Sequence, residues 1–257
     1  MPNWLDYPNY LNYIFIFLLG LIIGSFLNVC IYRLPRGESI VFPPSHCPYC
    51  QTRLKPWELV PVISWLWLRG RCHYCGEPVS WRYPAVELLT GLIFLLLFAR
   101  QGLTWSLLEQ LVLASFLLVL TMIDLEHCLL PDKLTISGLM VGFAFSALTP
   151  GVGWRSALVG LLVAGGSLLL VAVVSRGGMG GGDIKLAAMI GAWLGWPQAI
   201  LAVFLAFVVG GLAGILLLVT KIKSRKDLIP FGPFLAVGTF IAMLWGQGVV
   251  RWYLSLF

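Results

Sequence analysis

Charged side chains are scarce in this sequence of 257 residues. Only 11% of the residues are charged, eleven are acidic and three are histidine, whereas 59% are hydrophobic and the mean hydropathy is +0.91. Soluble domains carry about 25% charged residues. This composition excludes an ordinary soluble globular protein and indicates that most of the chain faces lipid.

Several other patterns are missing. The sequence has no repeat of about 20 to 50 residues and no low-complexity tail, which excludes repeat arrays. No basic residue precedes the first apolar stretch, so this stretch resembles an uncleaved anchor rather than a signal peptide. The run "GGMGGGDIK" lacks the G-x4-G-K-[ST] pattern, which argues against a phosphate-binding loop.

Long apolar runs are what the sequence has instead. A bilayer requires about 20 apolar residues for one helical span. We therefore predict an all-α polytopic membrane protein with about eight transmembrane helices. The runs cover residues 11–32, 85–99, 107–123, 134–148, 156–174, 184–196, 198–220 and 233–250.

The basic residues predict the orientation in the membrane, because loops rich in Lys and Arg stay in the cytoplasm. If residues 33–84 are cytoplasmic, 14 of the 17 basic residues fall on that side, and only Arg100, Arg155 and Arg251 fall outside. We therefore predict that both termini lie outside the cytoplasm. The net charge of +6 indicates the orientation in the membrane and attraction to anionic lipid headgroups rather than nucleic-acid binding.

The predicted organisation has five parts. Residues 1–32 form a first transmembrane anchor, residues 33–84 a cytoplasmic four-cysteine insert, and residues 85–106 a second span with an outer loop. Residues 107–250 form a membrane bundle that carries the chemistry, and residues 251–257 form an outer tail. Glycine pairs four residues apart in the bundle, such as Gly191 and Gly195, predict close helix packing.

The insert contains two C-x2-C pairs separated by 21 residues. This spacing is typical of a zinc site with four cysteine ligands, and such a site has no open coordination position. A reducing cytoplasm disfavours disulfides, so we predict a structural zinc ion that stabilises the small insert. Free cysteines and a redox dithiol pair are the alternatives. The predicted ligands are Cys47, Cys50, Cys72 and Cys75.

Two carboxylates stand out because an acid at membrane depth is costly. Asp124 ends a span, where the helix dipole disfavours an anion. Asp183 follows a glycine run next to a span too short to cross alone, so we expect part of that run to lie at membrane depth as irregular backbone lining a cavity. Together they predict an aspartyl dyad, in which two carboxyl groups share one proton. An ion-pathway acid in a transporter is the alternative.

Local helix chemistry explains the other acids near the spans. Asp132 precedes a helix, where we expect it to act as N-cap. Glu87 lies three residues after Pro84, which predicts a first helical turn favourable to a negative charge. Glu126 follows an apolar run and is expected to be solvated.

Five ordered motifs resemble those of the bacterial type IV prepilin leader peptidases, over roughly residues 15–245. They are "GSFLNVCIYRLPRGESIVFPPSHCPYC" (24–50), "CHYC" (72–75), "RYPAVELLTG" (82–91), "DLEHCLLPD" (124–132) and "GGGDIKLAAMIGAWLG" (180–195). The glycine-acid motif also resembles that of presenilin-like intramembrane aspartyl proteases.

The resemblance implies two activities at the cytoplasmic side of the bacterial inner membrane. The family cleaves the basic leader of type IV prepilins and type II secretion pseudopilins, and it methylates the new N-terminal amine, usually of phenylalanine, with S-adenosylmethionine. Carried over by position, Asp124 and Asp183 are the catalytic acids and Asp132 is supporting structure. The four cysteines match the tetrad of the larger bifunctional members.

The insert contains no glycine-rich nucleotide fingerprint that would mark the methyl-transfer site. The amine must lose a proton before it attacks the methyl group, and we expect Glu38 or Glu87 to act as the base. A membrane thiol oxidoreductase and an ion-coupled transporter are the alternative functions. The sequence predicts neither the particular pilin nor an oligomeric state.

Overall fold

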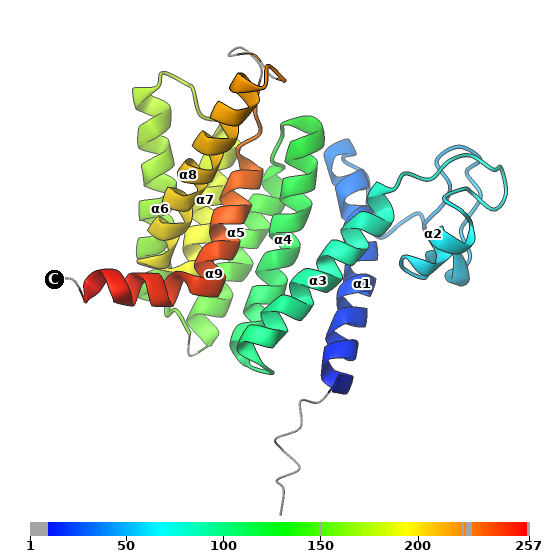
Figure 1. Cartoon of the computed structure of the whole chain (residues 1–257), viewed down its shortest axis with the longest axis horizontal. Helices are drawn as coiled ribbons and strands as arrows, with labels where there is room; N and C mark the ends of the chain where they lie inside the picture. The colour runs from blue at the N-terminus through cyan, green and yellow to red at the C-terminus, as the bar shows by residue number, and fades with distance from the viewer. Residues whose placement is uncertain (1–9, 150, 223, 225–227, 256–257) are drawn as a thin grey trace, which may run out of the picture. The chain divides into compact units, whose positions relative to one another are not determined.

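The computed structural model describes residues 10–149, 151–222, 224 and 228–255. They fold into helices joined by loops, and the only β pairing among them consists of isolated bridges in the insert (Figure 1). The chain divides into two compact units, residues 1–107 and residues 108–257.

Each predicted apolar run corresponds to a helix. These helices are α1 (Tyr10–Arg33), α3 (Arg82–Gln101), α4 (Trp105–His127), α5 (Asp132–Leu148), α6 (Trp154–Val174), α7 (Gly181–Leu194), α8 (Gln198–Val219) and α9 (Gly232–Leu254). Among the described residues, α1, α3, α4, α6 and α8 are long and apolar enough to cross a membrane by themselves. The prediction of an all-α polytopic membrane protein is confirmed, while α5 and α7 are shorter than a full span.

The first unit pairs α1 with α3 and carries the insert between them. The two helices approach closely because glycines face each other: a Cβ on Gly20 would lie 2.6 Å from the Cα of Gly91. The insert holds two short 3-10 helices, η1 (Leu34–Arg36) and η2 (Pro56–Leu59), and the short helix α2 (Ile63–Trp67). The rest of the insert is loop, so helix hydrogen bonds alone do not hold it in one conformation.

In the second unit α7 lies in the centre and packs against α5, α6, α8 and α9 (Figure 1). Trp193 of α7 is 6% exposed, and its indole Nε1 donates a hydrogen bond to the Gly138 carbonyl of α5 at 2.8 Å. Ser146 of α5 donates a hydrogen bond to the Ala192 carbonyl at 2.9 Å. These contacts hold the short helix α7 in the interior of the bundle.

The start of α7 differs from the sequence-based expectation. The sequence predicts that part of the glycine run is irregular backbone, and the residues up to Gly180 do lie outside a helix, but α7 begins at Gly181, two residues before Asp183. Asp183 therefore lies in the first helical turn, where the dipole favours a negative charge. The bends and turns before Gly180 remain outside the helix.

The crossing of α6 and α7 predicts a large effect of a single methyl group. A Cβ on Gly191 would lie 2.3 Å from the Gly160 carbonyl oxygen, so Gly191→Ala must push the two helices apart. We expect a loss of about 1–3 kcal/mol of stability, the usual cost of overpacking. Thermal unfolding in detergent measures it. Gly166→Ala is the matched control on α6, because a Cβ at Gly166 would meet open space. Equal melting temperatures of the Gly191→Ala and Gly166→Ala variants would contradict the prediction.

Candidate active site and metal centre

Asp124 is buried at the C-terminal end of α4. The helix continues past the predicted end of the span to His127, and Asp124 is only 4% exposed. A buried ionisable carboxyl group is costly unless it is hydrogen-bonded. Its Oδ2 accepts a hydrogen bond of 2.9 Å from the backbone N–H of Gly232.

Gly232, the first residue of α9, is a site residue that the sequence reasoning missed. A Cβ at this position would lie 2.7 Å from Oδ2 of Asp124, so the backbone reaches the carboxyl group only because the residue is glycine. The available signal was the stretch "IPFGPF" (229–234), in which a glycine between two prolines precedes an apolar run. Prolines and glycines concentrate at helix starts and close backbone approaches.

Asp183 is half-buried in the first turn of α7. Its carboxylate hydrogen-bonds the backbone of Gly180, the N-cap residue, and so supports the helix start. The neighbouring Gly182 lets the loop after α4 pack onto this turn, because a Cβ there would lie 2.9 Å from Cβ of Leu130. The glycine run thus gives room for another chain segment beside Asp183.

The structure brings Asp124 and Asp183 together in the second unit. The two carboxyl groups are close enough for Asp124 to act electrostatically on Asp183. The end of α4, the loop before α5 and the starts of α7 and α9 meet here, through Gly232 on Asp124 and Leu130 on Gly182. Two interacting carboxyl groups titrate as one unit and can share a single proton.

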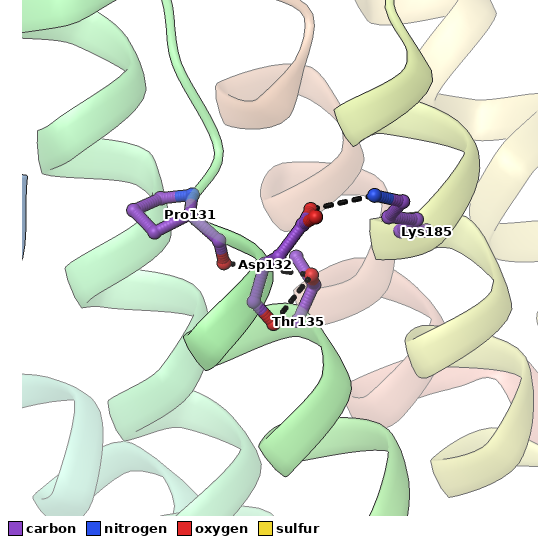
Figure 2. A network of polar contacts seen from close by, with 4 residues as sticks. All are labelled: Pro131, Asp132, Thr135 and Lys185. Carbon is purple, nitrogen blue, oxygen red and sulfur yellow. Dashed lines mark hydrogen bonds and ion pairs between the residues drawn. The ribbon is translucent and has the colours of Figure 1, made fainter.

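Asp132 does not cap α5 as predicted. Pro131 is the N-cap and Asp132 is the first helical residue. The helix puts the Asp132 side chain opposite α7, where its Oδ1 accepts a hydrogen bond of 2.7 Å from Lys185 Nζ (Figure 2). Both side chains are about half exposed, so the pair contributes at most about 1 kcal/mol. Its geometric effect is to tie the first turns of α5 and α7 together.

The two glutamates considered for methyl transfer differ in their surroundings. Glu38 is exposed in the loop after η1. Glu87 is 7% exposed, accepts a hydrogen bond of 2.8 Å from the Val62 backbone N–H and is hydrogen-bonded to the Ser25 side chain. The expectation that Glu87 lies in a first turn is wrong, because α3 begins at Arg82. Glu87 instead ties the middle of the insert, at Val62, to the pair of helices α1 and α3.

The four cysteines form two knuckles of the same design. In each, the backbone N–H of the first cysteine bonds the carbonyl five residues on, Thr52 or Glu77, at 3.0 and 2.8 Å. Gln51 and Gly76, which follow the second cysteines, both have positive φ, 59° and 74°. This repeated turn aims both thiols of a C-x2-C pair to one side.

The four thiols converge, with all sulfur atoms within 4.8 Å of one another. The distance from Cys47 Sγ to Cys75 Sγ is 3.8 Å, which equals the edge of about 3.8 Å expected for a tetrahedron with zinc–sulfur bonds of about 2.3 Å. Disulfide sulfurs would lie about 2.05 Å apart, and the cysteines are free. The donor set therefore fits zinc.

The thiols also differ in acidity. Hydrogen bonds from the side chain and backbone of Thr52 lower the pKa of Cys50 to about 6. The Glu77 backbone hydrogen bond lowers the pKa of Cys75, but desolvation and the neighbouring thiols outweigh it and raise that pKa to about 12. A metal ion would favour the thiolate form at every position, because metal ligands bind deprotonated.

Replacing one predicted ligand tests the metal centre. We expect Cys75→Ser to weaken zinc binding by at least about 100-fold, because even outer-shell changes cost about 10–100-fold in metal affinity. Inductively coupled plasma mass spectrometry of the purified protein measures the number of zinc ions per chain. Cys128→Ser, at an exposed cysteine outside the cluster, should keep the metal. Wild-type protein without zinc and with four alkylatable thiols would contradict the assignment.

Comparisons with known proteins agree with these motifs. Residues 18–101 match the Bacterial Peptidase A24 N-terminal domain, and residues 111–215 match the Type IV leader peptidase family. A protein of Aeromonas hydrophila called prepilin leader peptidase/N-methyltransferase is 38% identical over 279 residues, covering 96% of each chain. A protein of Bacillus subtilis (strain 168) with the same name is 34% identical, covering 94% of this chain and 97% of its own.

A third relative of that name, from Legionella pneumophila, is 37% identical over 98% of this chain and 97% of its own. No solved structure matches this chain significantly. The resemblance inferred from the five motifs is confirmed, since the similarity extends over nearly the whole chain. The chain therefore belongs to the type IV leader peptidase family.

Proposed function

We propose that this protein cleaves the leader of type IV prepilins and type II secretion pseudopilins with Asp124 and Asp183, and then methylates the new N-terminal amine with S-adenosylmethionine. The observation that carries the proposal is the convergence of the two acids at one end of the bundle in a chain of this family. Related proteins are called prepilin leader peptidase/N-methyltransferase, which supports both steps.

The peptidase step uses the shared proton of the acid pair. The ionised carboxylate takes a proton from water, and the oxygen of that water forms a bond to the scissile carbonyl carbon while the protonated carboxyl group polarises the carbonyl oxygen. Collapse breaks the C–N bond, and the leaving amine takes a proton from the pair. The Gly232 N–H holds Asp124 in one orientation during these steps.

The site is proposed to face the cytoplasm from the bacterial inner membrane. The substrate's leader stays in the cytoplasm while its apolar segment lies in the bilayer, so the junction between them reaches the acid pair. The basic residues that predict this orientation include Lys133 and Lys185, next to the starts of α5 and α7. Part of the basic stretch 221–227 lies outside the described residues.

Zinc is proposed as a structural ion of the insert. Cys47, Cys50, Cys72 and Cys75 would hold it. Four thiolates leave no open coordination position, so the ion when bound supplies rigidity rather than Lewis-acid chemistry. The insert has little regular secondary structure, which makes such an ion important for its fold.

Methyl transfer requires a base beside the amine. The ammonium group gives a proton to a carboxylate, the nitrogen lone pair attacks the methyl carbon, and the S–C bond breaks with its electrons staying on sulfur. Between the two candidates, the buried Glu87 is better suited than the exposed Glu38 to a site that excludes water.

We expect Glu87→Gln to slow methylation by about 10²-fold or more and Glu38→Gln to have little effect.

One experiment tests both activities. Purified wild-type protein in detergent is incubated with a prepilin and S-adenosylmethionine, and mass spectrometry reads the N-terminus of the product. The proposal expects loss of the leader and a gain of one methyl group. An intact prepilin contradicts the peptidase, whereas a cleaved product without a methyl group contradicts only the second step.

A further inference from the structure

Glu58, in the 3-10 helix η2 of the insert, is a buried carboxylate that neither the peptidase step nor the cysteine cluster uses. Its side chain is 7% exposed. Capping of η2 accounts for only one of its oxygens: Oε2 accepts hydrogen bonds from the Lys55 backbone N–H at 2.7 Å and from the Tyr74 hydroxyl at 3.4 Å. Oε1 is buried without a hydrogen-bond partner in the part of the chain that the structure describes.

Such an oxygen requires compensation. A buried ionised carboxylate is stable only when hydrogen bonds or an opposite charge offset its lost hydration. Two donors serve Oε2, and neither serves Oε1. The missing interaction is a hydrogen bond or an opposite charge, and an organic cation would supply the charge.

Aromatic rings stand beside this carboxylate. The Trp57 and His73 rings are 5.4 Å apart between centroids at 82°, and the His73 and Tyr74 rings are 5.2 Å apart at 83°. Both pairs have the edge-to-face arrangement that aromatic rings prefer, so the three rings form one packed group next to the hydrogen bond between Tyr74 and Glu58. Trp57 is 42% exposed and Tyr74 is 40% exposed, so ring surface remains open to a ligand.

The cysteine knuckle holds part of this group in place. His73 and Tyr74 are the two residues between Cys72 and Cys75, so the turn that aims the thiols also sets the backbone positions of both residues. Trp57 and Glu58 are consecutive in η2, and the Glu58 carboxylate binds the N-cap backbone of that helix. The two segments, which are distant in the sequence, are thus joined through the Tyr74 hydroxyl and Glu58.

We propose that Trp57, Glu58, His73 and Tyr74 form a binding site for an organic cation. Aromatic faces with a carboxylate bind ammonium and sulfonium groups through cation–π attraction and charge. The inference rests on the proposed methyl transfer, whose two reactants both carry such a group: the sulfonium of the methyl donor and the ammonium of the cleaved substrate.

The site is tested by comparing the binding of two ligands that differ in charge, so no enzymatic reaction needs to be measured. The full-length, zinc-loaded protein in detergent is titrated by calorimetry with S-adenosylmethionine and with S-adenosylhomocysteine, which lacks the sulfonium charge. A second pair consists of a phenylalanine-headed peptide with a free amine and its N-acetylated form. We expect the wild type to prefer the more positively charged member of one pair by about tenfold, the range of desolvated cation–π contacts.

The Glu58→Gln and Trp57→Leu variants should abolish this preference. Each should lower the affinity for the more positively charged ligand about tenfold and leave the affinity for the other ligand unchanged. A purely structural role would weaken both members alike. Tyr74→Phe, which keeps the ring, should retain most of the preference, and Trp67→Leu, at a side chain 80% exposed in α2, serves as the matched control. Metal content reports whether each variant keeps a folded insert.

The outcomes separate this site from the proposed function. Loss of preference in the first pair assigns the sulfonium, and loss in the second pair assigns the ammonium. Equal binding of both members of each pair to the wild type, or an unaltered preference in both folded variants, overturns the cation site. Cleavage and methylation by the wild type are measured separately, so either conclusion can fail alone.

Discussion

Asp124→Asn and Asp183→Asn are each expected to abolish prepilin cleavage, with a loss of at least about 10³-fold in rate. An amide neither takes a proton from water nor shares one with the partner acid, so either substitution removes the general acid–base pair. Both substitutions keep the side chain nearly the same size, and the amide that replaces the Asp124 carboxyl group retains an oxygen for the Gly232 N–H. Mass spectrometry of the product over time measures the rate.

The control for this pair is Glu126→Gln. Glu126 is two residues beyond Asp124 in the same helix, but its side chain is 33% exposed and lies beside His127. We expect nearly wild-type cleavage from this variant. Cleavage that survives in folded Asp124→Asn or Asp183→Asn protein would show that the acid has a structural or ion-handling role instead.

Gly232→Ala is expected to reduce cleavage by about 10²-fold, because a misplacement of about 1 Å at a catalytic group has an effect of this size. The added methyl group would lie 2.7 Å from Asp124 Oδ2 and 3.3 Å from its carboxyl carbon. The carboxyl group must turn away, and it then loses the backbone hydrogen bond that orients it. Initial cleavage rates at saturating prepilin measure the effect.

Gly248→Ala is the matched control in the same helix, because a Cβ there meets open space. It should leave both the cleavage rate and the melting temperature unchanged. A positioning role for Gly232 also predicts a shift in the pH profile of cleavage, whereas a simple packing defect lowers the melting temperature with the profile unchanged. Wild-type kinetics in Gly232→Ala would contradict the orienting contact.

Local patterns explain why parts of the site were predictable. The C-x2-C spacing is a property of two short turns, and each knuckle closes through hydrogen bonds within about six residues. Asp183 was identified because a carboxylate beside an apolar run is unusual whatever surrounds it. Asp132 and Glu87 were misread because N-cap and first-turn patterns describe a helix alone, while both side chains bind other segments.

The membrane class, the helical runs, the four-cysteine spacing and the candidate acids could all be inferred from the amino-acid order, because hydropathy and motif spacing depend on near neighbours. Which groups meet could be learned only from the folded chain. Gly232 reaches Asp124 across 108 residues, and Lys185 reaches Asp132 across 53. Such contacts depend on how glycines allow α7 and α9 to approach other segments, and close packing between distant helices leaves no periodic signal in one sequence.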